Sequence, residues 1–400
     1  MTKRIFALVL CLLLLMLTLL RAYAESGNTP ETAEQNGVTP AGTQDFDLPC
    51  KAAILIDEDS GTVLYEKNAD EQRPIASITK VMTLLLTFEA LEQGKIALTE
   101  VVPVSEHAYH MGGSQIWLEP GEQLTLDEML RAVCISSAND AAVAVAEFVG
   151  GSEDAFVQQM NERAAELGMN STHFENACGL DEQGHLSTAR DVAVMSREML
   201  LHHKEIADYC TIWMDTLRNG QTQLVNTNKL LKTYNGITGL KTGTTGGAGV
   251  CISASAERNG LRLIAVILGS ASGKERFEAA ATLLDYGFAN FENAETALPE
   301  EASQTLPVVR GTEQTVTLEY TAPGRYLVNK GQKDSLTTEL ELPECLEAPV
   351  EAGQQVGNVQ LLQNGTLLHR FPIRAKGEVQ VLTFGWCLER LARALLLGGI

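Results

Sequence analysis

Ser77 and Lys80, three residues apart, are the pair in this sequence best placed for nucleophilic chemistry. Residues at this spacing lie on one face of a helix, so the serine hydroxyl and the lysine amine can share a hydrogen bond. Serine is a poor nucleophile until a base takes its proton, and a buried lysine with a lowered pKa can be that base. Pro74, just upstream, suits a helix start, whose positive end favours a developing anion. Taken alone, this spacing is common by chance and is weak evidence.

A second motif, Ser137-Ala138-Asn139, falls at a break between two helical patterns, which is typical of a loop facing a cleft. There Ser137 is placed to relay a proton to a leaving amine, and Asn139 is placed to hold a substrate amide. If this motif is taken alone, a polar turn between helices is the simpler interpretation.

A third motif, Lys241-Thr242-Gly243, stands at the start of the apolar run of a predicted hairpin. Gly243 leaves room for a peptide to lie against the strand edge, and Lys241 and Thr242 can bind a terminal carboxylate. A second cation near Lys80 would also help to keep the Lys80 amine neutral.

Together, in this order and on these predicted elements, the three motifs are a strong signal for acyl transfer through a serine. The backbone N–H groups of Ser77 and Thr244 are then the expected donors to the oxyanion.

The elements that must position these motifs run from strands to helices and back to strands. Apolar runs at 52–56 and 62–65 predict one hairpin, and runs at 250–256 and 261–268 around Asn259-Gly260 predict another. Helical patterns are found at 77–91, after the capping-box pair Thr125 and Glu128, and at 141–149, 152–167, 188–202 and 275–288. We therefore expect an α/β (α+β) main domain in which helices flank an antiparallel sheet.

The chain divides into five predicted segments. They are an export signal at 1–24, a flexible linker at 25–47, the main domain at 48–292, a small all-β domain at 303–377 and a C-terminal helix at 379–400. The acidic, alanine-rich residues 290–305 are interpreted as a boundary.

The export signal has a basic head at Lys3 and Arg4, an apolar stretch and the small-x-small site Ala22-Tyr23-Ala24. An uncleaved membrane anchor is the alternative. The C-terminal helix places Phe384, Leu388, Leu391 and Leu395 on one stripe, which predicts a helix lying in a membrane interface, or one docked on the protein itself.

Charge and cysteine usage exclude several classes of function. A net charge of −21 over 400 residues argues against a nucleic-acid partner, because phosphate binding needs a concentrated basic surface. The cysteines after the export signal are scattered and include no C-x-x-C pair, so neither a disulfide framework nor a zinc site is indicated. We expect no metal and no cofactor, and expect most cysteines to be small buried residues.

The three motifs resemble those of the penicillin-recognising serine enzymes, which comprise D-Ala-D-Ala peptidases and serine β-lactamases. Longer stretches are similar to the low-molecular-mass D-alanyl-D-alanine carboxypeptidases of the S11 peptidase type. These stretches are 76–83, 179–181, 184–189, 226–231, 239–245 and 248–251. The resemblance is close over about residues 50–290 and looser over the all-β domain.

The resemblance implies a catalytic domain of the serine β-lactamase and DD-peptidase type, followed by a small β domain and a membrane-associating helix. It implies removal of the terminal D-alanine from peptidoglycan stem peptides outside the cytoplasm. It also implies that a β-lactam such as penicillin acylates Ser77 and leaves slowly. Ser77, Lys80 and Ser137 would be catalytic, and Asn139, Lys241, Thr242, Gly243 and Thr244 would bind substrate.

Three alternatives stay open. A class A β-lactamase should carry a Glu followed by Asn in an E-x-x-x-N pattern, whereas this chain has Phe174-Glu175-Asn176-Ala177. A transpeptidase differs only in its acceptor, so the sequence separates it weakly. A non-catalytic peptidoglycan-binding protein predicts a lost motif residue, and none is lost.

Overall fold

The computed structural model describes residues 46–321 and 324–397. The predicted export signal at 1–24 and nearly all of the predicted linker at 25–47 lie outside these residues and stay predictions.

A five-stranded antiparallel sheet forms the centre of the main domain, in the order β2-β1-β9-β8-β7. Its strands are β1 (Ala52–Asp57), β2 (Val63–Lys67), β7 (Ile237–Thr245), β8 (Gly249–Arg258) and β9 (Leu261–Ser270). Both predicted hairpins are confirmed, and β1 joins them into one sheet by pairing with β9, for example Ile54 with Val266.

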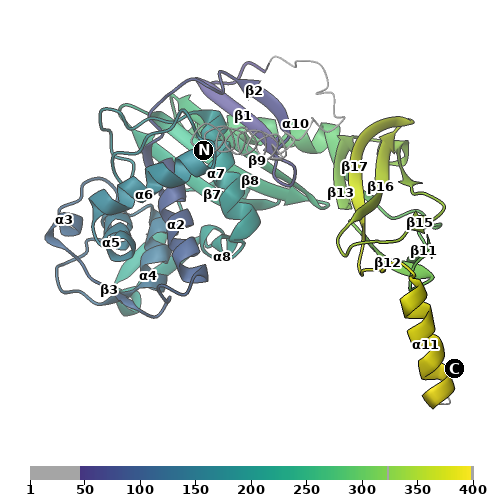
Figure 1. The fold of residues 1–400 in the computed structure, drawn as a ribbon. Helices are drawn as coiled ribbons and strands as arrows, with labels where there is room; N and C mark the ends of the chain where they lie inside the picture. Colours follow the sequence, from purple (N-terminus) through teal and green to yellow (C-terminus); the bar gives the residue numbers. More distant parts are fainter. Residues whose placement is uncertain (1–45, 322–323, 398–400) are drawn as a thin grey trace, which may run out of the picture. The chain divides into compact units, whose positions relative to one another are not determined.

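Both faces of this sheet are covered, which explains why its strands are apolar runs rather than alternating patterns. On one face, Ile54 and Val266 pack in a core with α2 (Lys80–Glu92) and α7 (Ala189–His202). On the other face, Leu55 and Leu263 pack against α10 (Gly273–Asn290), and Figure 1 shows these helices on opposite sides of the sheet.

The remaining helices of the main domain build a mostly helical region beside the sheet. They are α3 (Glu106–Tyr109), α4 (Leu126–Arg131), α5 (Asn139–Gly150), α6 (Glu153–Glu166), α8 (Ile206–Cys210) and α9 (Leu230–Thr233). This region also contains three short helical turns of other types, at Ala76–Thr79, Ala132–Ser136 and Arg218–Gly220. Two short strand pairs are found there as well. In one, β3 (Val101–Val102) pairs with β4 (Leu124–Thr125), and in the other β5 (Met214–Leu217) pairs with β6 (Thr222–Val225). The capping box of Thr125 and Glu128 is confirmed at the start of α4.

The C-terminal part consists of strands followed by one helix. The strands are β10 (Phe291–Thr296), β11 (Thr305–Val309), β12 (Thr315–Tyr320), β13 (Gly324–Asn329), β14 (Leu336–Glu341), β15 (Leu346–Glu347), β16 (Gln355–Gln363) and β17 (Thr366–Ala375), with a short turn at Lys333–Ser335 and the helix α11 (Phe384–Leu397). Six of these strands form one sheet, and β10 pairs with β13.

Three local expectations need correction. The Lys241 motif was expected at the start of the hairpin, but it lies on a separate strand, β7, which is the sheet edge beside β8. The helix expected at 77–91 begins with a 3-10 turn, so that Lys80 is the first residue of α2. The stretch at 290–305 was expected to be a boundary, yet residues 291–296 form β10 because β13 supplies a partner strand.

The cysteines behave largely as expected. Five are free and buried, namely Cys50, Cys134, Cys178, Cys210 and Cys251, whereas Cys345 and Cys387 are free and exposed. Within the described residues, no helix is long and apolar enough to cross a membrane.

Candidate active site

The first predicted pair meets at the junction of the 3-10 turn and α2. Ser77 lies in the turn and Lys80 opens the helix, so the lysine side chain points back toward the serine. Lys80 Nζ lies 3.0 Å from Ser77 Oγ, and no part of Lys80 is exposed. The pair therefore has the contact that proton transfer from the serine requires.

Two further oxygen atoms surround the Lys80 amine. Its Nζ atom donates to Asn139 Oδ1 and to the Cys178 carbonyl, each at 2.6 Å. Burial lowers the pKa of Lys80 to about 8, and the nearby Asp140 carboxylate partly opposes this shift. About a tenth of the amine is thus neutral at pH 7, far more than for an exposed lysine, and a neutral amine can accept the Ser77 proton.

The second and third motifs meet through Ser137 and Lys241. Lys241 Nζ donates to Ser137 Oγ at 2.8 Å and to the Thr242 carbonyl at 3.0 Å, and Lys241 is also buried. Burial, together with the nearby Lys80 charge, lowers the pKa of Lys241 to about 7. The expected repulsion between the two amines contributes to the lowered pKa of Lys241, and burial is the main cause of the lowered pKa of Lys80.

Ser137 reaches this position through an unusual backbone path. A π-helical turn, Ala132–Ser136, precedes it, and Ser137 itself adopts a left-handed conformation with φ of 61° before α5 begins at Asn139. A serine in this region is uncommon, and both features often occur at functional sites. The predicted break between helices is this turn.

Edge strand β7 runs directly beside the Ser77 turn. A Cβ atom on Gly243 would lie 2.9 Å from the Ile75 carbonyl oxygen and 3.0 Å from Ser77 N. Glycine is thus needed for β7 to approach the turn, a reason additional to the predicted room for a peptide. Thr244 follows Gly243, so its backbone and that of Ser77 are neighbours, as the predicted oxyanion site requires. Thr242 Oγ1 donates to Thr227 Oγ1 at 2.7 Å.

Sequence reasoning did not identify Arg276 of α10. Its Nη1 atom donates to the carbonyls of Gly243 at 3.2 Å and Cys251 at 3.0 Å, and burial lowers the pKa of Arg276 to about 10. Among the described residues its hydrogen-bond partners are carbonyl and hydroxyl oxygens and not carboxylates, and its Nε atom has no partner there. A buried cation without an anion beside β7 is suited to a ligand that brings a carboxylate. A single arginine within a helical pattern gave no sequence signal.

A second set of missed contacts lies behind Ser77. The Thr79 hydroxyl shares a 2.7 Å hydrogen bond with His185 Nε2, and burial lowers the pKa of His185 to about 4, which keeps this imidazole neutral. The Cys178 carbonyl at Lys80 was also missed, because a backbone acceptor leaves no trace in residue type.

Comparisons with known proteins place this fold among the D-alanyl-D-alanine carboxypeptidases. Residues 38–272 match the D-alanyl-D-alanine carboxypeptidase family of S11 peptidases, and residues 291–381 match the C-terminal domain of penicillin-binding protein 5. The chain belongs to this D-alanyl-D-alanine carboxypeptidase family.

Individual relatives agree with this assignment. The chain is 40% identical over 352 residues to D-alanyl-D-alanine carboxypeptidase DacF of Bacillus subtilis, covering 87% of this chain and 90% of that protein. Penicillin-binding protein 5 of Haemophilus influenzae superposes with a TM-score of 0.73 at 30% identity, covering 85% of this chain and all of that one. Penicillin-binding protein D2 of Listeria monocytogenes, solved with ampicillin bound, superposes with a TM-score of 0.56 at 32% identity, over 61% of this chain and 99% of that one.

Proposed function

We propose that this protein is a serine-type D-alanyl-D-alanine carboxypeptidase that removes the terminal D-alanine from peptidoglycan stem peptides through a Ser77 acyl-enzyme. The observation that carries this proposal is the contact between Ser77 Oγ and the buried Lys80 amine, 3.0 Å apart, with the Lys80 pKa lowered to about 8. Family membership supports the substrate class.

The acylation step uses the groups around Ser77. Neutral Lys80 takes the hydroxyl proton while Ser77 Oγ attacks the carbonyl carbon of the penultimate D-alanine. The carbonyl oxygen gains negative charge and accepts hydrogen bonds from the backbone N–H groups of Ser77 and Thr244. The carbon–nitrogen bond then breaks, and Ser137 gives its hydroxyl proton to the amine of the departing D-alanine while it takes the proton that Lys80 accepted, so that Lys80 is neutral again. Asn139 holds the amide of the stem peptide.

Recognition of the terminal carboxylate explains why the last residue is the one removed. Lys241 and Thr242 lie on β7 and Arg276 donates to the Gly243 carbonyl of the same strand, so two cations and a hydroxyl group lie near β7. A substrate carboxylate would supply the anion that Arg276 lacks among the described residues. Water then hydrolyses the acyl-enzyme and regenerates Ser77.

A β-lactamase is the main alternative, and the structure favours the carboxypeptidase. In a class A enzyme a glutamate near the nucleophile activates the deacylating water. Glu175 faces His173 at 3.2 Å, and Asn176 uses its side-chain oxygen to accept from the Gly179 backbone at 2.7 Å. Neither residue has a hydrogen bond to Ser77 or Lys80, so slow deacylation of penicillin is expected.

We further propose that the protein acts outside the cytoplasm, on the outer face of the cell membrane, with α11 lying in the interface. Phe384, Leu388, Leu391 and Leu395 on this helix are all more than half exposed, as the predicted stripe requires. Such a helix gains free energy by burying its apolar side chains among lipid headgroups.

Mass spectrometry with penicillin tests the proposed nucleophile. The protein should gain one penicilloyl group, and peptide mapping should place that group on Ser77. The adduct should persist for far longer than it takes to form. Rapid turnover of penicillin would favour the β-lactamase, and a protein that gains no adduct would contradict the proposal.

A further inference from the structure

A loop outside the three motifs fixes the orientation of the Asn139 side chain. Asn139 Nδ2 donates to the Gly112 carbonyl at 2.7 Å, while Oδ1 faces Lys80 Nζ at 2.6 Å. A carbonyl only accepts hydrogen bonds, so the Gly112 contact identifies the nitrogen end of the amide. The backbone N–H of Asn139 also donates to the Ser114 carbonyl at 2.7 Å. The loop that carries Gly112 and Ser114 therefore decides which amide atom faces Lys80.

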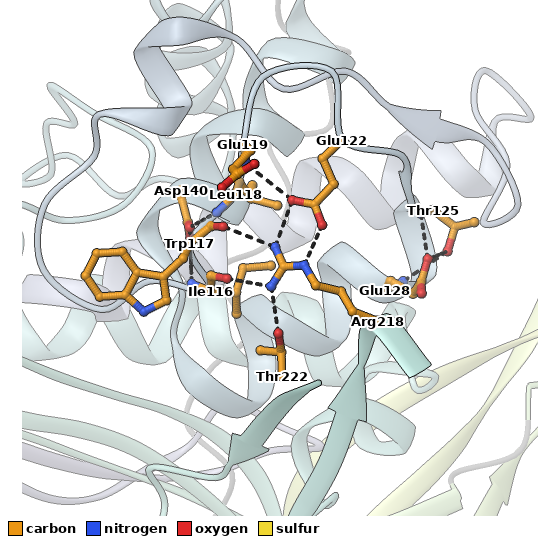
Figure 2. Close-up of polar contacts among 10 residues, drawn as sticks. All are labelled: Ile116, Trp117, Leu118, Glu119, Glu122, Thr125, Glu128, Asp140, Arg218 and Thr222. Carbon is orange, nitrogen blue, oxygen red and sulfur yellow. Dashed lines mark hydrogen bonds and ion pairs between the residues drawn. The ribbon is translucent and has the colours of Figure 1, made fainter. Parts of the chain in front are cut away.

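A buried carboxylate holds the next part of this loop. Asp140 Oδ2 accepts the backbone N–H groups of Ile116 and Leu118, each at 3.1 Å, as Figure 2 shows. Asp140 is 1% exposed and directly follows Asn139 at the start of α5. The loop is thus bonded to two consecutive residues of the helix that enters the active site.

Arg218 holds the same loop from the other side (Figure 2). Its Nη1 atom donates to the Ile116 carbonyl at 2.7 Å, and Nη2 donates to the Trp117 carbonyl at 3.2 Å. Its Nε and Nη2 atoms also form a forked ion pair with Glu122, in which Nη2 lies 2.8 Å from Oε2. The hydrogen bond with Arg218 lowers the pKa of Glu122. Forked, charge-assisted bonds are strong and strict in geometry.

The backbone of this loop is strained at Trp117. Its φ of 60° lies in the left-handed region, which a bulky side chain rarely adopts. The indole does not hold this conformation by packing, because Trp117 is 75% exposed. The peptide groups on both sides are instead held by hydrogen bonds, to Asp140 through the N–H groups and to Arg218 through the carbonyls. Strain of this kind persists only where the surroundings impose it.

We infer that Arg218 is a positioning residue for acylation, acting through loop 112–122 on Asn139. By keeping Trp117 in its strained conformation, Arg218 keeps the Gly112 and Ser114 carbonyls against Asn139, and so keeps the amide oriented toward Lys80. Without Arg218 the loop relaxes toward negative φ at Trp117, and Asn139 loses the acceptor that orients it. The inference rests on the roles proposed above for Lys80 and Asn139.

Acylation kinetics with a fluorescent penicillin test this inference on the full chain. Arg218→Gln should lower the acylation rate constant at saturating penicillin by roughly ten- to a hundredfold, because small displacements of catalytic groups have large effects on rate. Arg163→Gln is the matched control. Arg163 has a similarly buried side chain, 23% against 19% exposed, and its ion pairs join α6 to Glu89 and Glu198 instead of to the loop. Its acylation rate should stay within about twofold of the native rate.

Trp117→Gly in the Arg218→Gln background separates positioning from simple loss of stability. Glycine adopts positive φ without strain, so the loop no longer lowers its free energy by changing φ at position 117. The double variant should therefore recover much of the lost acylation rate. Arg218→Lys should not recover it, because an ammonium group cannot form the fork with Glu122. Thermal unfolding of each variant gives its folded fraction, and each acylation rate is divided by that fraction before the variants are compared.

Three outcomes would overturn the inference. They are native acylation in Arg218→Gln, a loss no larger than that of Arg163→Gln, and a loss that Trp117→Gly leaves unchanged. Failure of the proposed function looks different, because the native protein would then form no penicilloyl adduct on Ser77.

Discussion

At the residue scale, the site is built from two buried amines and the oxygen atoms that surround them. The sequence predicted the side chains that meet there, because Ser77, Lys80, Ser137 and Lys241 belong to motifs with a definite spacing. It could not predict the carbonyls of Cys178 or Gly112, since every residue carries a carbonyl and only the fold decides which one faces the cleft.

The pH dependence of kcat/KM follows from the two lysines. Lys80 must be neutral to act as a base, so the rate rises with pH as its proton is lost, with a pKa of about 8. Lys241 must be protonated to bind a carboxylate, so the rate falls with pH as that proton is lost, with a pKa of about 7. The two amines titrate as a pair, and we expect a bell-shaped profile for D-alanine release with its maximum between these values.

Lys241→Arg tests the assignment of the alkaline limb. A guanidinium group stays protonated throughout this range, so the fall in kcat/KM should move to above about pH 9. What remains below that pH is the rise with a pKa of about 8 that follows loss of the Lys80 proton. An unchanged alkaline limb in this variant would mean that another group causes it.

At the element scale, the sequence predicted most strands and helices but not how closely these elements pack against one another. The two predicted hairpins have strong turn signals, whereas β10 depends on β13, a partner strand that is distant in the sequence. Helix α10 illustrates close approach, because Gly287 faces the sheet. A Cβ atom at this position would lie 2.4 Å from Leu263 Cδ1 and 3.1 Å from Leu55 Cδ2.

Gly287→Ala should therefore destabilise the protein by about 1–3 kcal/mol, the usual effect of overpacking a core, although alanine favours helices over glycine. Gly273→Ala is the control in the same helix, because the nearest atom to its added Cβ is Arg276 Nη2 at 3.9 Å. Denaturant unfolding measures both variants. If Gly287→Ala were as stable as Gly273→Ala, the tight packing of α10 on β1 and β9 would be wrong.

At the scale of the whole molecule, the chain combines a catalytic domain, a β domain and a helix with an exposed apolar stripe. Composition indicated an acidic protein, and the N-terminal pattern at 1–24 predicted export. The stripe on α11 could be predicted because helical spacing alone defines it. The sequence could not show whether the stripe packs on the protein. In the structure its members are exposed.

A chain that ends at Thr383 tests the proposed role of α11. It should sediment with phospholipid vesicles far less than the full chain, because the apolar side chains that enter the interface are gone. Its kcat/KM for a soluble peptide should be unchanged, since no catalytic residue is removed. Equal sedimentation of the two chains would assign membrane contact, if any, to another part of the protein.

Release of D-alanine from a soluble pentapeptide ending in D-Ala-D-Ala tests the central claim most directly. The native protein should release one D-alanine per peptide, Ser335→Ala in the β domain should match it, and Ser77→Ala should release none above the uncatalysed background. No release by the native protein would contradict the carboxypeptidase assignment, and equal release by Ser77→Ala would remove Ser77 from its role as the nucleophile.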